Sequence, residues 1–179
     1  MNRKLVNGVI VAGFSMLVFG CGGGGGGSST PAPAPATTAV VTLQTTGTPS
    51  APYKGMDLTV TLPAGVTVAT DPLNPKQTAV GTLKLSGVFS RYSTQITPRP
   101  FFGRYSSAGA GKPAAVIIGI ASGTVSLPVG EFATLNCGLA SGTTTVSLTD
   151  FSVVNFAAYG TGGASVTGLA ASPLAVTLK

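Results

Sequence analysis

The side chains that could carry out acid, base or nucleophilic chemistry are few in this chain. Histidine is absent, so neither a Ser-His-Asp triad nor a Cys-His pair can form, and no histidine can ligate a metal. The acidic residues are Asp57, Asp71, Glu131 and Asp150, and no two of them are close in sequence. Two of them could still meet in space as the carboxylate pair of a glycosidase. A position in a turn or at a strand edge explains each of them more simply, and we expect a protein that is not an enzyme.

One weak metal site is suggested by the segment Asp71-Pro72-Leu73-Asn74, which has the composition of a turn. Asp71, Asn74 and backbone carbonyls could share a calcium ion. The segment lacks the regularly spaced oxygen ligands of a dedicated calcium loop. We therefore expect no metal and no dissociable cofactor.

The segment between Ser90 and Pro113 combines positive charge with aromatic rings. It holds half of the basic residues that follow Lys4, and arginine beside tyrosine or phenylalanine is typical of binding hot spots. The candidate binding residues are Arg91, Tyr92, Arg99, Phe101, Phe102, Arg104 and Tyr105. A second interpretation stays open: a loop or extra hairpin in which Phe101 and Phe102 pack onto the domain while the cations remain solvated.

The N-terminus has the pattern of an export signal. Asn2-Arg3-Lys4 is followed by an uncharged, mostly apolar run from Leu5 to Gly20, which is shorter than the roughly 20 residues of a membrane-spanning helix. The run ends in Val18-Phe19-Gly20-Cys21, which resembles the lipobox of bacterial lipoproteins. The resemblance implies a signal peptide over residues 1–20, cleavage before Cys21, and a covalent lipid on that cysteine. An ordinary secretory signal, with Cys21 incidental, is the other interpretation.

The same resemblance predicts where the protein resides. Two or three acyl chains on one cysteine anchor a protein stably in a membrane. In such lipoproteins an aspartate after the cysteine favours the inner membrane, and this chain has Gly22 there. We therefore expect a lipid-anchored protein of the cell envelope, in the outer membrane rather than the inner one. A net charge near +4 without Arg3 and Lys4 is too small to indicate nucleic-acid binding.

Residues 21–37 have the composition of a tether. Gly22 to Gly27 is an unbroken glycine run, which behaves as a flexible coil. Pro31 to Ala36 alternates proline and alanine, which favours an extended polyproline II spacer. We expect this segment to hold a domain of residues 38–179 away from the membrane.

Residues 38–179 have the pattern of an all-β domain. Apolar residues alternate with threonine and other polar residues at a period of two, and Gly, Pro, Asn and Asp separate the segments. The expected strands contain Val41 and Leu43; Leu58 to Val68 with a bend at Pro63-Ala64-Gly65; Leu83 and Leu85; Ala114 to Ala121, buried on both faces; Ala133 to Leu139; Val146 and Leu148; Phe151 and Val153; and Leu174 to Leu178. Eight or nine such strands predict an antiparallel β-sandwich.

Three strings in this domain resemble cohesin-like modules, which are jelly-roll sandwiches related to carbohydrate-binding modules. They are GMDLTVTLPAGVTV (residues 55–68), GEFATLNC (residues 130–137) and TVSLTDFSVVN (residues 145–155). The resemblance implies a jelly-roll fold and a role in binding, since family members bind dockerins or sit on cell surfaces. Ser90 to Pro113 departs from the family pattern as a long insertion, and no dockerin-contacting residue can be assigned.

If Cys21 carries a lipid, Cys137 has no cysteine with which to form an intrachain disulfide. It alternates in phase with Leu135 and Leu139, which favours a buried, inert thiol. A reactive thiol or an intermolecular bridge is the alternative.

Together these patterns predict a lipid-anchored, non-enzymatic β-sandwich that binds or scaffolds a protein or polysaccharide partner outside the cytoplasm. The alternative is a carbohydrate-active or assembly-assisting lipoprotein of an envelope complex for secretion or electron transfer.

Overall fold

The computed structural model describes residues 34–92, 101–143 and 145–179. The predicted signal peptide (1–20), Cys21, most of the predicted tether and Arg99 lie outside these residues. The strands are β1 (Thr38–Gly47), β2 (Gly55–Thr61), β3 (Val66–Val68), β4 (Thr70–Asp71), β5 (Asn74–Thr78), β6 (Leu83–Leu85), β7 (Phe101–Ser106), β8 (Ala115–Ala121), β9 (Glu131–Leu139), β10 (Ser152–Tyr159), β11 (Ser165–Val166) and β12 (Leu169–Leu178). Three short 3₁₀ helices join them: η1 (Gly87–Tyr92), η2 (Leu148–Asp150) and η3 (Thr161–Gly163).

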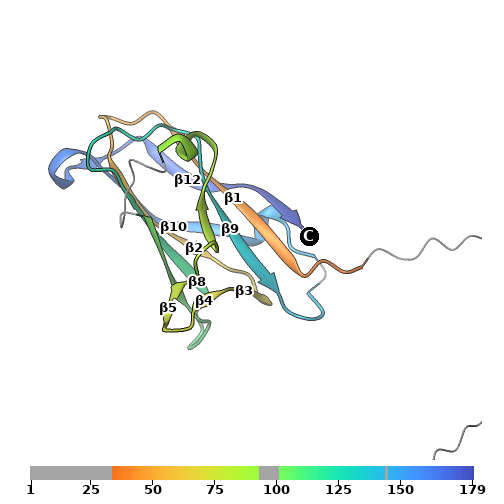
Figure 1. Cartoon of the computed structure of the whole chain (residues 1–179). Coiled ribbons are helices and arrows are strands. Elements are labelled where there is room, and N and C mark those ends of the chain that lie inside the picture. Colours follow the sequence, from red (N-terminus) through yellow and green to blue (C-terminus); the bar gives the residue numbers. More distant parts are fainter. Residues whose placement is uncertain (1–33, 93–100, 144) are drawn as a thin grey trace, which may run out of the picture. The chain divides into compact units, whose positions relative to one another are not determined.

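The strands form two antiparallel sheets, as Figure 1 shows. The five-stranded sheet has the order β12-β1-β9-β3, and β6 also pairs with β9. The seven-stranded sheet has the order β11-β10-β2-β8-β7-β5-β4. The all-β sandwich predicted from the sequence is therefore confirmed.

One hydrophobic core contains the inward residues of both sheets. Val41 and Leu43 of β1 and Leu135 of β9 contribute from the five-stranded sheet, and Leu58 of β2 and Ile118 of β8 contribute from the other. All five are at most 1% exposed. The period-two alternation read from the sequence thus identifies which side chains face the core, where full burial of each stabilises the fold by about 1.5–3 kcal/mol.

The predicted bend at Pro63-Ala64-Gly65 separates two strands that belong to different sheets. β2 lies in the seven-stranded sheet and β3 in the five-stranded one. Gly65 has φ +77°, a left-handed conformation that glycine adopts without a steric penalty. The chain changes sheets at this bend.

Two strand predictions are wrong. Ala114–Ala121 is not buried on both faces, because Ile117 is 42% exposed on an outer face that no described element covers. Val146 and Leu148 do not form a strand; Leu148 begins the helix η2 instead. The amide and hydroxyl of Ser147 both donate to the Asp150 carboxylate, at 2.7 and 2.9 Å, and this local bonding favours a turn over an extended strand.

The segment expected to be an insertion contributes a strand to the interior of the larger sheet. β7 pairs with β8 from Phe101↔Ile120 to Ser106↔Ala115, and β5 pairs with its other edge at Gln77↔Arg104. Its side chains are consequently divided between the core and the outer face of the sheet.

The first and last described strands lie side by side. β1 pairs with β12 on one edge and with β9 on the other. The Thr38 amide donates to the Lys179 carbonyl at 3.0 Å, and the Lys179 amide donates to the Thr38 carbonyl at 2.9 Å. The chain therefore enters and leaves the domain at the same end.

Candidate functional site

The structure divides the candidate binding residues among three places. Arg91 and Tyr92 are on η1, which contacts β9 of the five-stranded sheet. Phe101 and Tyr105 of β7 are half-buried and pack against the core, while Phe102 and Arg104 point outward from the seven-stranded sheet. Arg99 lies outside the described residues.

Arg91 is engaged within η1. Its guanidinium lies 5.5 Å from the centre of the Tyr92 ring, and its Nε donates to the Val88 carbonyl at 3.3 Å. Next to this pair, Phe89 is fully buried against Phe132, with 5.9 Å between ring centres. Phe89 thus anchors the helix, and the Arg91–Tyr92 contact is a local cation–π pair.

Phe102 occupies a special position on the outer face of the seven-stranded sheet. It pairs with Gly119 of β8, and its ring covers the place where a side chain on Gly119 would stand. The Cε1 and Cζ atoms of the ring lie over the glycine, and the side chain remains 37% exposed. Both phenylalanines therefore pack onto the domain: Phe101 against the core, and Phe102 over Gly119 on the outer face, where it remains partly exposed.

Asp57 lies on the other side of Gly119. It pairs with Gly119 through the β2–β8 register and is exposed on the same face. A Cβ on Gly119 would lie 3.0 Å from the Asp57 Oδ1. Among the described side chains, none forms a hydrogen bond with this carboxylate.

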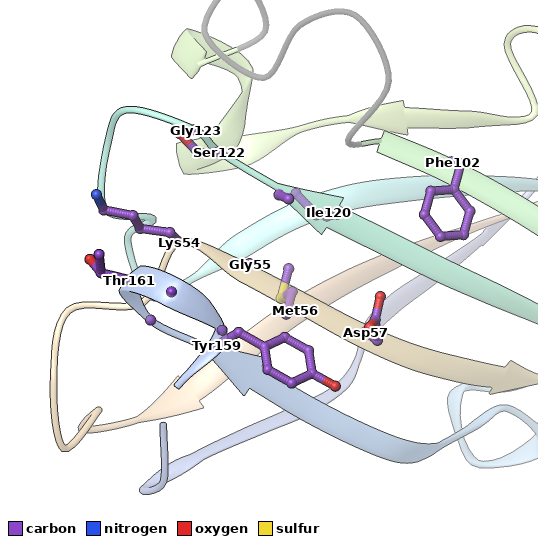
Figure 2. A pocket seen from close by; sticks show the side chains of 14 residues that line it. Lys54, Gly55, Met56, Asp57, Phe102, Ile120, Ser122, Gly123, Tyr159 and Thr161 are labelled. Atoms are coloured by element: carbon purple, nitrogen blue, oxygen red, sulfur yellow. The ribbon is translucent and has the colours of Figure 1, made fainter. Parts of the chain in front are cut away.

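An open hollow of about 420 Å³, which we call the end hollow, begins beside this carboxylate. Figure 2 shows Phe102 and Tyr159 on opposite sides of Asp57. The hollow is lined by Lys54, Gly55, Met56, Asp57, Phe102, Ile120, Ala121, Ser122, Gly123, Tyr159, Gly160, Thr161, Gly162 and Gly163. Its volume falls in the range of small-molecule sites.

Backbone hydrogen bonds hold the strand ends around the end hollow. The Lys54 amide donates to the Tyr159 carbonyl at 2.7 Å, and the Ser122 amide donates to the Lys54 carbonyl at 2.6 Å. The Ser122 hydroxyl accepts from the Val125 amide at 3.0 Å and fixes the following loop. The hollow is therefore formed before any ligand arrives.

Next to the hollow, a row of neighbouring side chains on the outer face contains two exposed apolar residues and ends in an arginine. The register places Val154 of β10, Thr59 of β2, Ile117 of β8 and Arg104 of β7 in line across the sheet. Val154 and Ile117 are 43% and 42% exposed. Two apolar side chains and an arginine on one open face form a surface suited to a partner.

The acidic residues lie on four different elements: Asp57 on β2, Asp71 on β4, Glu131 on β9 and Asp150 on η2. The described residues contain no cluster of three histidine, cysteine, aspartate or glutamate residues that could hold a metal. The Asp71 Oδ1 accepts a hydrogen bond from the Leu73 amide at 2.8 Å, which confirms the predicted turn. That turn joins β4 and β5.

Cys137 is buried in the core, 2% exposed, as its alternation predicted. Its thiol donates weakly to the Leu135 carbonyl at 3.9 Å. Burial raises the pKa of the Cys137 thiol to about 12. A protonated, buried thiol is inert at neutral pH, which argues against the reactive interpretation.

Asp57 and Tyr159 were missed as site residues by the sequence analysis. The period-two pattern places Asp57 on the outer face, but its proximity to Tyr159 depends on the pairing Tyr159↔Gly55 between strands far apart in sequence. The sequence does contain one indication, Gly119 in the middle of the apolar run. A glycine inside a strand often marks a place where another group lies close to the backbone, here the ring of Phe102.

Within the described residues, no helix is long and apolar enough to cross a membrane. Comparison with family models, with curated proteins and with solved structures finds no protein that this chain matches.

Proposed function

We propose that this chain is a lipid-anchored binding module of the cell envelope, which engages a protein or polysaccharide partner through the outer face of its seven-stranded sheet. The lipid on Cys21 and the envelope location rest on the sequence pattern around that cysteine. The binding role rests on the sheet.

The observation that carries the proposal is the gathering of exposed apolar and aromatic groups on one face. Phe102, Ile117 and Val154 are each 37–43% exposed there, beside Arg104. Leaving such groups in water is unfavourable, and a partner that covers them recovers roughly 25 cal/mol for each Å² of apolar surface.

The position of the face supports the proposal. The chain enters the domain at Thr38, and β1 then extends over about 30 Å before Gly47. The loop after β1 leads to Lys54 and Gly55, which line the end hollow. The start of β2, which lines the hollow, thus lies at the end of the domain opposite to Thr38, where the chain enters (Figure 1).

The test is capture by the full chain, in detergent, from solubilised cell envelopes. The retained material is analysed both for protein and for sugar composition. Arg104→Glu and Phe102→Ala are expected to lower retention of a specific component at least tenfold. Lys84→Glu is the matched control, because Lys84 is also an exposed cation but lies on β6 of the other sheet. Equal retention by all four proteins would contradict the proposal.

A further inference from the structure

We infer that the end hollow binds a neutral polysaccharide, with Phe102 and Tyr159 stacking on sugar rings and the Asp57 carboxylate accepting hydrogen bonds from sugar hydroxyls between them. This inference rests on the proposed function, because it names the ligand class for the same sheet face.

The spacing of the three side chains fits an extended chain of sugars. Phe102 and Asp57 stand in one row, two strands apart, which corresponds to about 10 Å. Tyr159 pairs with Gly55, two residues along β2 from Asp57, which places Tyr159 and Asp57 about 7–8 Å apart on a diagonal. The two rings therefore lie on either side of a hydrogen-bond acceptor, at a span longer than a single sugar.

The chemistry of each side chain suits a sugar. A pyranose ring has C–H groups on its faces and hydroxyls at its edge. A partly exposed aromatic ring, such as that of Phe102, can cover the C–H groups. A carboxylate accepts hydrogen bonds from two neighbouring hydroxyls more strongly than a neutral acceptor does.

The floor and the rim of the hollow fit the same ligand. Gly55 and Ala121 pair side by side on the floor and leave it nearly flat, so that a chain can lie close to the sheet. The rim supplies the polar groups of Lys54 and Thr161. A flat floor with a polar rim suits a polyhydroxylated chain better than a single large apolar group.

Two features disfavour the other classes of ligand. An extended peptide binds most readily at an unpaired strand edge, but β2 and β8 are paired on both edges. An anionic chain crossing the hollow would meet the Asp57 carboxylate, and like charges in contact are unfavourable.

The experiment is affinity electrophoresis of the full chain in detergent, run toward the cathode in native gels. Each gel contains hydroxyethyl cellulose, laminarin, galactomannan or dextran, and a gel without polysaccharide is the reference. We expect retardation in at least one of the four. Phe102→Ala, Tyr159→Ala and Asp57→Ala should each weaken the apparent affinity at least about tenfold. Phe102→Tyr and Tyr159→Phe, which keep a ring, should retain most of it.

Val129→Ala serves as the matched control, because Val129 is also 37% exposed but does not line the hollow. Unretarded migration in all four gels overturns the inference, as does retardation that the three alanine variants do not change. If migration is unaffected while Phe102→Ala still abolishes capture of an envelope protein, the ligand is a protein: the polysaccharide inference fails and the proposed function stands. If both assays are negative, both fail.

Discussion

The ring of Phe102 occupies the place where a Cβ on Gly119 would stand, on the neighbouring strand of the seven-stranded sheet. Glycine in a strand loses packing and exposes backbone, and an aromatic ring on the adjacent strand restores cover. The contact also fixes the ring beside Asp57. A structural role and the recognition role that we propose thus fall on one side chain.

Gly119→Ala should separate these two roles. A methyl group at this position would overlap the Cε1 and Cζ atoms of Phe102, so the ring must swing away. The Gly119 backbone does not have a positive φ, and alanine is therefore tolerated by the strand itself. We expect a melting temperature within a few degrees of the parent and a loss of ligand binding comparable to that of Phe102→Ala. A crystal structure of the variant would show whether the ring has moved; unchanged binding with a displaced ring would contradict the role of Phe102.

Replacing Phe102 and replacing Phe132 with alanine should differ sharply in their effect on the free energy of unfolding. Phe102 is 37% exposed, whereas Phe132 is fully buried in the core. Phe132→Ala should lower the free energy of unfolding by about 3–5 kcal/mol, and Phe102→Ala by about 1 kcal/mol. Chemical denaturation of both variants measures the difference. A loss of 3 kcal/mol or more for Phe102→Ala would assign that ring to the core rather than to binding.

The Cys137 thiol should make stability fall at alkaline pH. Its pKa is raised from 9.0 to about 12 by burial, so between these values the unfolded chain releases a proton that the folded chain keeps. The contribution is present in full below pH 9 and is lost as the pH rises toward 12, with a slope of at most about 1.4 kcal/mol per pH unit. Cys137→Ala should reduce that slope. The pKa of Tyr53 is also raised, by desolvation, so part of the alkaline loss should remain in the variant.

The burial of Cys137 also predicts that its thiol reacts slowly with thiol-specific reagents. A thiol-specific reagent at neutral pH should label it only at the rate of unfolding, and denaturant should make labelling fast. Mass spectrometry of the native chain detects the adduct on a peptide containing Cys137. Stoichiometric labelling within minutes without denaturant would show that the thiol is accessible.

Cys21→Ala tests the membrane anchor. If Cys21 is lipidated, the variant should leave the membrane fraction or accumulate as an uncleaved precursor of greater mass. Fractionation of cells, followed by mass measurement, distinguishes these outcomes from normal processing. A variant that remains in the membrane with the mass of the parent would exclude the lipobox interpretation.

Most of the fold could be predicted from local patterns, because the core-facing residues of a strand repeat every second position. Val41, Leu58 and Leu135 were identified in this way. The exposure of Ile117 could not be predicted, because an apolar run has the same sequence pattern whether one or both faces of its strand are covered. The helix η2 was missed because Ser147 and Asp150 bond to each other where the alternation suggested a strand.

The candidate site was predicted less completely. The composition of residues 90–113 drew attention to Phe102 and Arg104, and it also included Phe101 and Tyr105, which pack inward. Asp57 and Tyr159 join Phe102 only through the pairing of β10, β2, β8 and β7. Such registers depend on the packing of the whole sandwich and not on any one segment.

The position of β1 has a mechanical consequence. A force applied to the chain before Thr38 pulls along the axis of this strand, which is paired to β9 and β12 along its two edges. Such a force acts in shear, so the backbone hydrogen bonds on both sides of the strand must break together and not one pair after another. If the domain is anchored through the chain before Thr38 and binds a ligand at its far end, as we propose, this arrangement would resist unfolding when the ligand is pulled.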